Sequence, residues 1–127
     1  MDGIQVLLFV ESRYKVNRKR VKQTALSLLS EHGIKGPAEV SVAIVGDRKM
    51  RQVHKKYKGA DKTTNVLSFS LLEGETEVLP EGTLRLGDVV ISYPEVIREA
   101  VKEEVLVDDK IDELLKHGLM HLLGVHH

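Results

Sequence analysis

The hydrophobic and polar positions of this 127-residue chain fall into blocks that predict four strands. Residues 4–10, IQVLLFV, form a continuous apolar run of strand length with β-branched and aromatic side chains, which is typical of a buried strand. Residues 39–45, EVSVAIV, alternate and then become fully apolar. Residues 65–70 and 86–92 are two further apolar blocks bounded by turn-forming residues, and we interpret both as strands.

Apolar residues at helical spacing predict four helices, two of them between these strands and two after the last strand. Asn17 is a suitable N-cap for the first helix, and Asp47 is expected to cap a short second helix whose outer face is basic. Pro94 opens a helix over about residues 95–104, and the last helix is expected over about residues 108–123. The apolar stripe of this last helix, which we expect to enter the core, comprises Ile111, Leu114, Leu115, Gly118, Leu119 and Leu122.

The connecting segments and the length indicate a single domain. Turn-forming residues predict loops over residues 58–64 and 72–82, and the first has the composition of many active-site loops. A chain of 127 residues with 42% hydrophobic content is long enough for one core and too short for two ordinary domains. We therefore expect one domain spanning residues 1–127.

The composition excludes disulfides and thiolate metal sites, because the chain has no cysteine. Near the N-terminus, Asp2 and Glu11 flank an apolar run of only seven residues, so we expect neither a signal peptide nor a membrane span. The expected location is therefore the cytoplasm, without a membrane partner.

The net charge of zero conceals an uneven distribution of charge. Residues 1–62 contain 14 Lys plus Arg and 6 Asp plus Glu, whereas the remaining residues contain 5 and 13. The basic residues concentrate within residues 18–22 and 55–62. A basic half is typical of proteins that bind polyanions, although runs of charge are more often solvated helix faces. Charge alone therefore leaves nucleic-acid binding open.

The last eleven residues, HGLMHLLGVHH, contain the spacing of a metal site. His117 and His121 are neighbours on one helix face, at the border of the core stripe, and Gly124 ends the helix so that His127 can return to them. Three neutral imidazoles suit zinc and leave a fourth position for water, as in catalytic zinc sites. We expect one Zn²⁺ per chain held by these three histidines, with His126 as the alternative third ligand.

A zinc site of this kind predicts hydrolysis, because zinc lowers the pKa of bound water to about 7. The histidine spacing equals that of metzincin proteases, but Gly118 stands where the protease carries its glutamate base. This argues against peptide hydrolysis and leaves a metallopeptidase-like hydrolase as an alternative. A purification tag or a chance cluster of surface histidines does not explain the spacing of His117, His121 and Gly124.

The histidine motif, together with TNVLSF at residues 64–69 and LGDVVI at residues 86–91, resembles the YbeY family of metal-dependent endoribonucleases in bacterial rRNA maturation. The resemblance spans nearly the whole chain. The family motif HGxLHLxGYDH is kept at every histidine and both glycines, with Met120, Val125 and His126 at its Leu, Tyr and Asp positions. Its register favours the final histidine as the third ligand.

The resemblance implies a small single-domain α+β fold, in which a four-stranded mixed sheet and helices pack around a central metal-bearing helix. It implies zinc-dependent, single-strand-specific cleavage of RNA in rRNA maturation and ribosome quality control. The expected partners are single-stranded rRNA and the ribosome or one of its subunits, and no DNA. It also implies a C-terminal segment beyond residue 127, disordered or absent here. A ribosome-associated RNA-binding protein whose metal only stiffens the chain end is the non-catalytic alternative.

Three further residues are candidates for the catalytic chemistry. Lys58 precedes Gly59 where the family has arginine, so it keeps the charge for binding the RNA backbone but loses the bidentate fork. Ser68 and Asp88 are candidates for orienting a ligand or transferring a proton, against ordinary roles in a sheet or a turn. The sequence leaves open the physiological metal and whether water or the RNA 2′-hydroxyl attacks.

Overall fold

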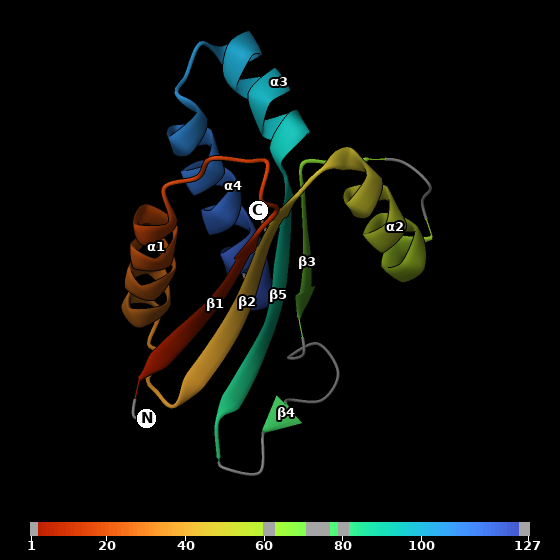
Figure 1. Cartoon of the computed structure of the whole chain (residues 1–127). Helices are drawn as coiled ribbons and strands as arrows, with labels where there is room; N and C mark the ends of the chain where they lie inside the picture. The colour runs from red at the N-terminus through yellow and green to blue at the C-terminus, as the bar shows by residue number, and fades with distance from the viewer. Residues whose placement is uncertain (1–2, 60–62, 71–76, 79–81, 125–127) are drawn as a thin grey trace.

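The structure is a computed structural model that describes residues 3–59, 63–70, 77–78 and 82–124 (Figure 1). Its elements are, in order, β1 (Ile4–Val10), α1 (Arg18–Glu31), β2 (Ala38–Val45), α2 (Asp47–Lys58), β3 (Val66–Ser70), β4 (Glu77–Val78), β5 (Leu84–Ser92), α3 (Tyr93–Glu103) and α4 (Val107–Leu122). The four predicted strands and four predicted helices are all present, with bounds that differ by a few residues. No helix within the described ranges is long and apolar enough to cross a membrane.

The strands form one mixed sheet in the order β1-β2-β5-β3. β1, β2 and β5 run parallel to one another, and β3 runs antiparallel to β5 at the edge. This confirms the α+β fold with a four-stranded mixed sheet. The two-residue β4 adds a short antiparallel pairing to β5, in a stretch that the sequence pattern predicts as a surface loop.

Helices α1 and α4 lie side by side on one face of the sheet, which we call the covered face (Figure 1). The six apolar residues predicted for the stripe of α4 are all buried, as expected. They pack against α1 and against alternate residues of β1, β2 and β5, including Val6, Val40 and Ile91. The main hydrophobic core therefore lies between this helix pair and the sheet.

The opposite face, which we call the open face, carries only α2 among the helices of the described ranges (Figure 1). A small cluster of Val45, Met50, Leu67 and Val90 packs beneath this helix. Further along the same face, Leu7 and Phe9 of β1 are 44% and 58% exposed. The prediction that residues 4–10 form a buried strand is therefore wrong for one of the two faces of β1.

Helix ends confirm some predicted caps and correct one. The Asn17 side chain accepts a hydrogen bond from the Arg20 amide at the start of α1, as predicted. Asp47 is not the N-cap of α2, because Gly46 holds that position and Asp47 is the first residue of the helix. Gly124 follows α4 with a φ of 79°, which is the left-handed conformation expected there.

Candidate functional site

His117 and His121 lie one turn apart on α4 and form the centre of the candidate site. Their ring centroids are 4.9 Å apart and the ring planes are inclined by 53°. His117 is exposed and His121 is half-buried, so both lie at the border of the core stripe, as the helical spacing predicts. Two neutral imidazoles in this arrangement are suitable ligands for one zinc ion.

Gly118 brings this histidine pair close to the sheet. It is buried, and a Cβ atom at this position would lie 2.7 Å from Val89 Cγ1 and 3.3 Å from Val66 Cγ2. Because Gly118 has no side chain, α4 can pack directly on β3 and β5. The same contact leaves no room for glutamate, so the base of a protease with this histidine spacing is sterically excluded at residue 118.

The histidine pair faces a hollow of about 270 Å³ beside β3. The hollow is lined by Lys58, Val66, Leu67, Ser68, His117, Gly118 and His121. The structure therefore brings four of the predicted site residues together from three elements, namely α2, β3 and α4. An ammonium group, a hydroxyl and two imidazoles around one hollow are suited to an anionic substrate group.

Asp88, by contrast, lies on the other side of the sheet. Asp88 pairs with Phe69 and lines a groove on the open face, whereas Ser68 pairs with Val89 of the covered face. Between its pairings with Glu39 and Ser41 of β2, β5 contains one more residue than β2, which is a β-bulge. This extra residue reverses the alternation, so Asp88 and Leu86 lie on opposite faces. The structure does not bring Asp88 into the hollow.

The predicted third ligand, His127, and its alternative, His126, lie outside the described residues. Within the described ranges, no three His, Cys, Asp or Glu residues are grouped so that they could hold a metal ion. The described donors still fit zinc, because both are imidazoles and no carboxylate of the described residues lines the hollow. The three-histidine site therefore stays a prediction.

Lys58 reaches the hollow from the last position of α2. Gly59, with a φ of 74°, ends this helix in the left-handed conformation. The Lys58 ammonium nitrogen lies 5.8 Å from the centroid of the Phe69 ring on β3. Lys58 therefore stands at the edge strand, between the hollow and the open face.

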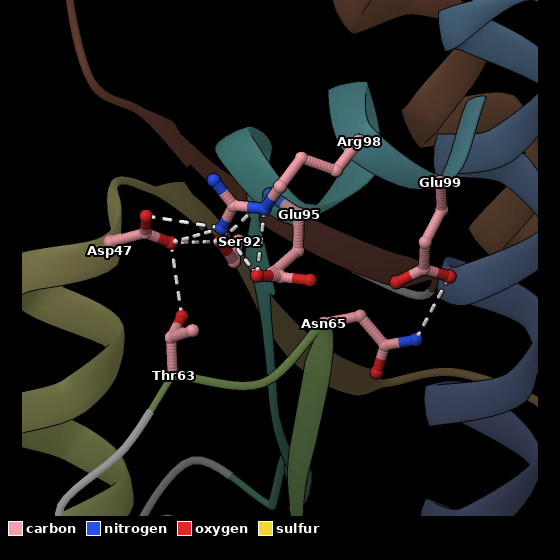
Figure 2. Close-up of polar contacts among 7 residues, drawn as sticks. All are labelled: Asp47, Thr63, Asn65, Ser92, Glu95, Arg98 and Glu99. Atoms are coloured by element: carbon pink, nitrogen blue, oxygen red, sulfur yellow. Dashed lines mark hydrogen bonds and ion pairs between the residues drawn. The ribbon is translucent and has the colours of Figure 1, made fainter. Parts of the chain in front are cut away.

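Asp47 anchors the opposite end of α2 (Figure 2). Its Oδ1 accepts hydrogen bonds from Thr63 Oγ1 at 3.0 Å and Ser92 Oγ at 3.1 Å, and its Oδ2 accepts one from Arg98 Nη2 at 3.1 Å. Partial burial raises the pKa of Asp47, but the bonds from Arg98, Thr63 and Ser92 outweigh it and hold that pKa below its usual value. The carboxylate thus ties α2 to α3 and to the segment that enters β3.

A second polar network, which the sequence analysis missed, holds α3 against α4. Lys110 is 3% exposed, and its ammonium group donates hydrogen bonds to Glu103 and Glu113 and contacts Glu99 at 3.5 Å. The bond to Glu113 raises the pKa of Lys110, although burial opposes this shift. Glu99 also accepts a hydrogen bond from Asn65 (Figure 2). Only the Lys110–Glu113 spacing is visible in the sequence as a signal for this network.

Comparison with known proteins gives consistent matches over most of the chain. The profile of a family described as "Endoribonuclease YbeY" matches residues 9–127. Proteins named Endoribonuclease YbeY from Thermodesulfovibrio yellowstonii and Syntrophus aciditrophicus are 37% and 34% identical over 93% and 92% of this chain. This chain spans 73% and 71% of those two relatives, and 54% of a third from Anaeromyxobacter that is 39% identical over 86% of the chain.

One solved structure supports the fold. The solution structure of a Thermotoga maritima protein matches with a TM-score of 0.58 and 20% sequence identity. The match covers 98% of this chain and 74% of that chain. At this level of identity the match supports the architecture of the sheet and helices, and the chemistry of the site has to be argued from its own residues.

Proposed function

Because the chain belongs to the endoribonuclease YbeY family, we propose that it is a metal-dependent hydrolase that cleaves phosphodiester bonds of RNA. One observation carries this proposal: the His117–His121 pair faces the same hollow as Lys58 and Ser68. A phosphodiester has an anionic oxygen for the lysine and for a metal ion. A peptide bond has no such charge, and residue 118 has no room for a protease base.

We assign one Zn²⁺ to His117, His121 and His127. When bound, zinc polarises a phosphate oxygen and lowers the pKa of a coordinated water. The two histidines of α4 act as neutral ligands, and the packing of Gly118 holds them beside β3. Lys58 binds a non-bridging phosphate oxygen and offsets the negative charge that builds up on it. The Ser68 hydroxyl offers a hydrogen bond within the hollow.

A single strand is the preferred substrate in this proposal. The hollow lies at an edge strand, and a flexible strand can bend one phosphate into a volume of about 270 Å³ more easily than a stiff duplex. The basic residues of α2 provide the electrostatic attraction that RNA binding requires. As the family resemblance implies, we propose rRNA as the substrate, the ribosome or a subunit as the partner and the cytoplasm as the location.

The test starts from metal-free protein, into which zinc is titrated while cleavage of a single-stranded RNA and of a matched duplex is followed. We expect cleavage to rise with bound zinc up to one ion per chain and to favour the single strand. A variant with His117→Ala and His121→Ala should lose zinc binding and cleavage together. His32→Ala is the matched control, because its imidazole lies after α1 and contacts the Leu28 carbonyl. Unchanged cleavage by the repurified double variant would refute the assignment.

The same preparations separate the two alternatives. A metallopeptidase-like hydrolase would cleave a peptide library and leave RNA intact. A non-catalytic RNA-binding protein would bind RNA or ribosomes after chelation and show no turnover at any zinc concentration. Our proposal expects RNA cleavage that stops on chelation and no cleavage of the peptide library.

A further inference from the structure

A groove of about 590 Å³ runs across the open face of the sheet, away from the histidine pair. Strand pairing places its side chains in two rows that cross all four strands. One row is Leu7, Ser41, Asp88 and Phe69, and the other is Phe9, Ala43 and Val90, which continues to the buried Leu67 beneath α2. Val53 and Tyr57 of α2 add to the wall beside β3.

Aromatic side chains stand at both ends of this groove. Phe9 on β1 is 58% exposed and Tyr57 on α2 is 57% exposed. The Tyr57 ring lies 4.7 Å from that of Phe69, centroid to centroid. β1 and β3 are three strand spacings apart, so the two aromatic ends are separated by roughly 14 Å. Exposed aromatic rings gathered along one groove indicate a binding surface.

The floor of the groove between the aromatic ends is formed by small side chains and is partly polar. Ser41 and Ala43 of β2 are small, which makes the centre of the face concave between the bulkier side chains of β1 and β3. Ser41 and Asp88 lie next to each other in one row and offer hydrogen-bond partners to the edge of a base. In known RNA-binding modules, a four-stranded sheet with exposed aromatic residues stacks two or three bases.

The helix beside the groove is strongly basic. Its exposed cationic residues are Arg48, Lys49, Arg51, Lys55, Lys56 and Lys58. None of the six makes an ion pair with a carboxylate of the described residues. An apolar, aromatic floor beside a row of cations matches the two chemical parts of a single-stranded nucleic acid, which are flat bases and a phosphate backbone.

Lys58 connects this groove to the histidine hollow. Its ammonium group lies 5.8 Å from the centroid of Phe69, which lines the groove, and Lys58 itself lines the hollow. One strand of RNA can therefore have bases on the open face and a phosphate at the hollow without leaving the protein surface.

We propose that the open face is a stacking platform for two or three unpaired bases of the RNA, located on Phe9, Tyr57 and Phe69. The phosphates between these bases run along α2 and reach the histidine hollow at Lys58. This inference rests on the proposed function, because it assigns the surface that holds the single strand for cleavage. It also explains a preference for single strands, since bases paired in a duplex cannot lie flat on the sheet.

The test measures binding separately from cleavage. A fluorescently labelled ten-nucleotide single strand is titrated with the His117→Ala and His121→Ala double variant in the presence of chelator, and anisotropy gives the Kd. In that background, Phe9→Ala is expected to raise the Kd about tenfold, in line with the loss of one stacked base. An abasic oligomer of the same length loses every stacked base, so it should bind at least about a hundredfold more weakly than the RNA and should no longer respond to Phe9→Ala.

Phe9→Leu distinguishes stacking from general apolar contact. Leucine keeps an apolar side chain but has no aromatic face, so stacking predicts that this variant also binds RNA several-fold more weakly. Val101→Ala is the matched control, because Val101 is an apolar residue of α3 that is 74% exposed. Thermal unfolding of each variant establishes that the fold is intact.

Several outcomes overturn the platform. They are an unchanged Kd for Phe9→Ala, an unchanged Kd for Phe9→Leu, or a self-association of the wild-type chain that Phe9→Ala abolishes. The last would assign the face to a second copy of the chain. Failure of the proposed function looks different, because the RNA would then bind in a Phe9-dependent way and stay uncut by the zinc-loaded wild type.

Discussion

The two faces of the sheet carry similar apolar side chains and differ in what covers them. On β1, Val6 and Val10 point to the covered face and are 9% and 6% exposed, whereas Leu7 and Phe9 point to the open face and remain 44% and 58% exposed. These four residues belong to one uninterrupted apolar run. Hydrophobicity along the chain therefore identifies a strand, but it does not distinguish a face that stabilises the fold from one that is available for binding.

The comparison also locates the candidate chemistry. The histidines belong to the covered face, where α4 packs on the sheet through Gly118, and the aromatic groove belongs to the open face. The two meet at β3, the edge strand, where Lys58 reaches both. In this arrangement one face holds the reacting groups rigidly, and the other presents a surface to the substrate.

The largest expected effect tests the energetic difference between the faces with the same substitution on each. Leu29→Ala removes a side chain of α1 that is 0% exposed and belongs to the core on the covered face, and it should lower the free energy of unfolding by about 2–5 kcal/mol. Leu7→Ala on the open face should cost less than about 1 kcal/mol, because Leu7 is 44% exposed. Urea unfolding of both variants measures the two values. Equal losses would contradict the distinction between a covered and an open face.

The next effect concerns the edge at which the faces meet. Lys58→Ala removes the cation that lines the hollow, so kcat for RNA cleavage should fall roughly 100-fold, as for the loss of one transition-state donor. Lys58→Arg keeps the positive charge and adds a guanidinium group that can donate two parallel hydrogen bonds to a phosphate. It should therefore keep kcat at or above the wild-type value.

The measurement for the Lys58 variants is single-turnover cleavage at saturating RNA and equal zinc content. Lys102→Ala, which removes an exposed lysine from the last turn of α3, is the matched control. An undiminished kcat in Lys58→Ala would remove this residue from the reaction.

Helical periodicity accounts for the features that sequence predicted well. The register of α4 is set by 3.6 residues per turn, so the positions of His117 and His121 beside the stripe follow once the stripe is identified. The order and approximate bounds of the strands also follow from local pattern, because they depend on residues that are close in sequence.

Features that depend on distant partners could not be predicted. The face of Asp88 depends on one extra residue in β5 relative to β2. Gly87, a glycine inside the strand with a φ of 140°, is a signal for this bulge, but it does not identify the register with β2. The role of Asp47 depends on Ser92 and Arg98, which are 45 and 51 residues away. The exposure of Phe9 depends on the absence, within the described ranges, of a helix over that end of the sheet.

A smaller effect tests how closely the covered face holds the histidines. Gly118→Ala places a methyl group 2.7 Å from Val89 Cγ1. Overpacking of this kind costs about 1–3 kcal/mol, and the better helix propensity of alanine returns up to about 1 kcal/mol, so a modest net destabilisation is expected. The displacement of α4 should also weaken zinc binding.

Adding Val89→Ala makes room for the methyl group, so the double variant should be less destabilised than the sum of the two single variants. Strict additivity, measured by urea unfolding, would contradict this close packing.

The smallest expected effect concerns the carboxylate that ties α2, and with it the wall of the open face, to the rest of the fold. The pKa of Asp47 is lowered in the folded state, so its contribution to stability is present above its unfolded pKa of about 3.9 and is lost as the pH falls through the folded value. Asp47→Asn keeps the shape but loses the charge that Arg98 contacts, and it should cost about 1 kcal/mol at pH 7. Urea unfolding from pH 7 to pH 2 should therefore show the wild type and Asp47→Asn converging in acid. Asp112 of α4 also has a lowered pKa, so both proteins lose stability in acid, and a constant difference between them across this range would exclude Asp47 as the titrating anchor.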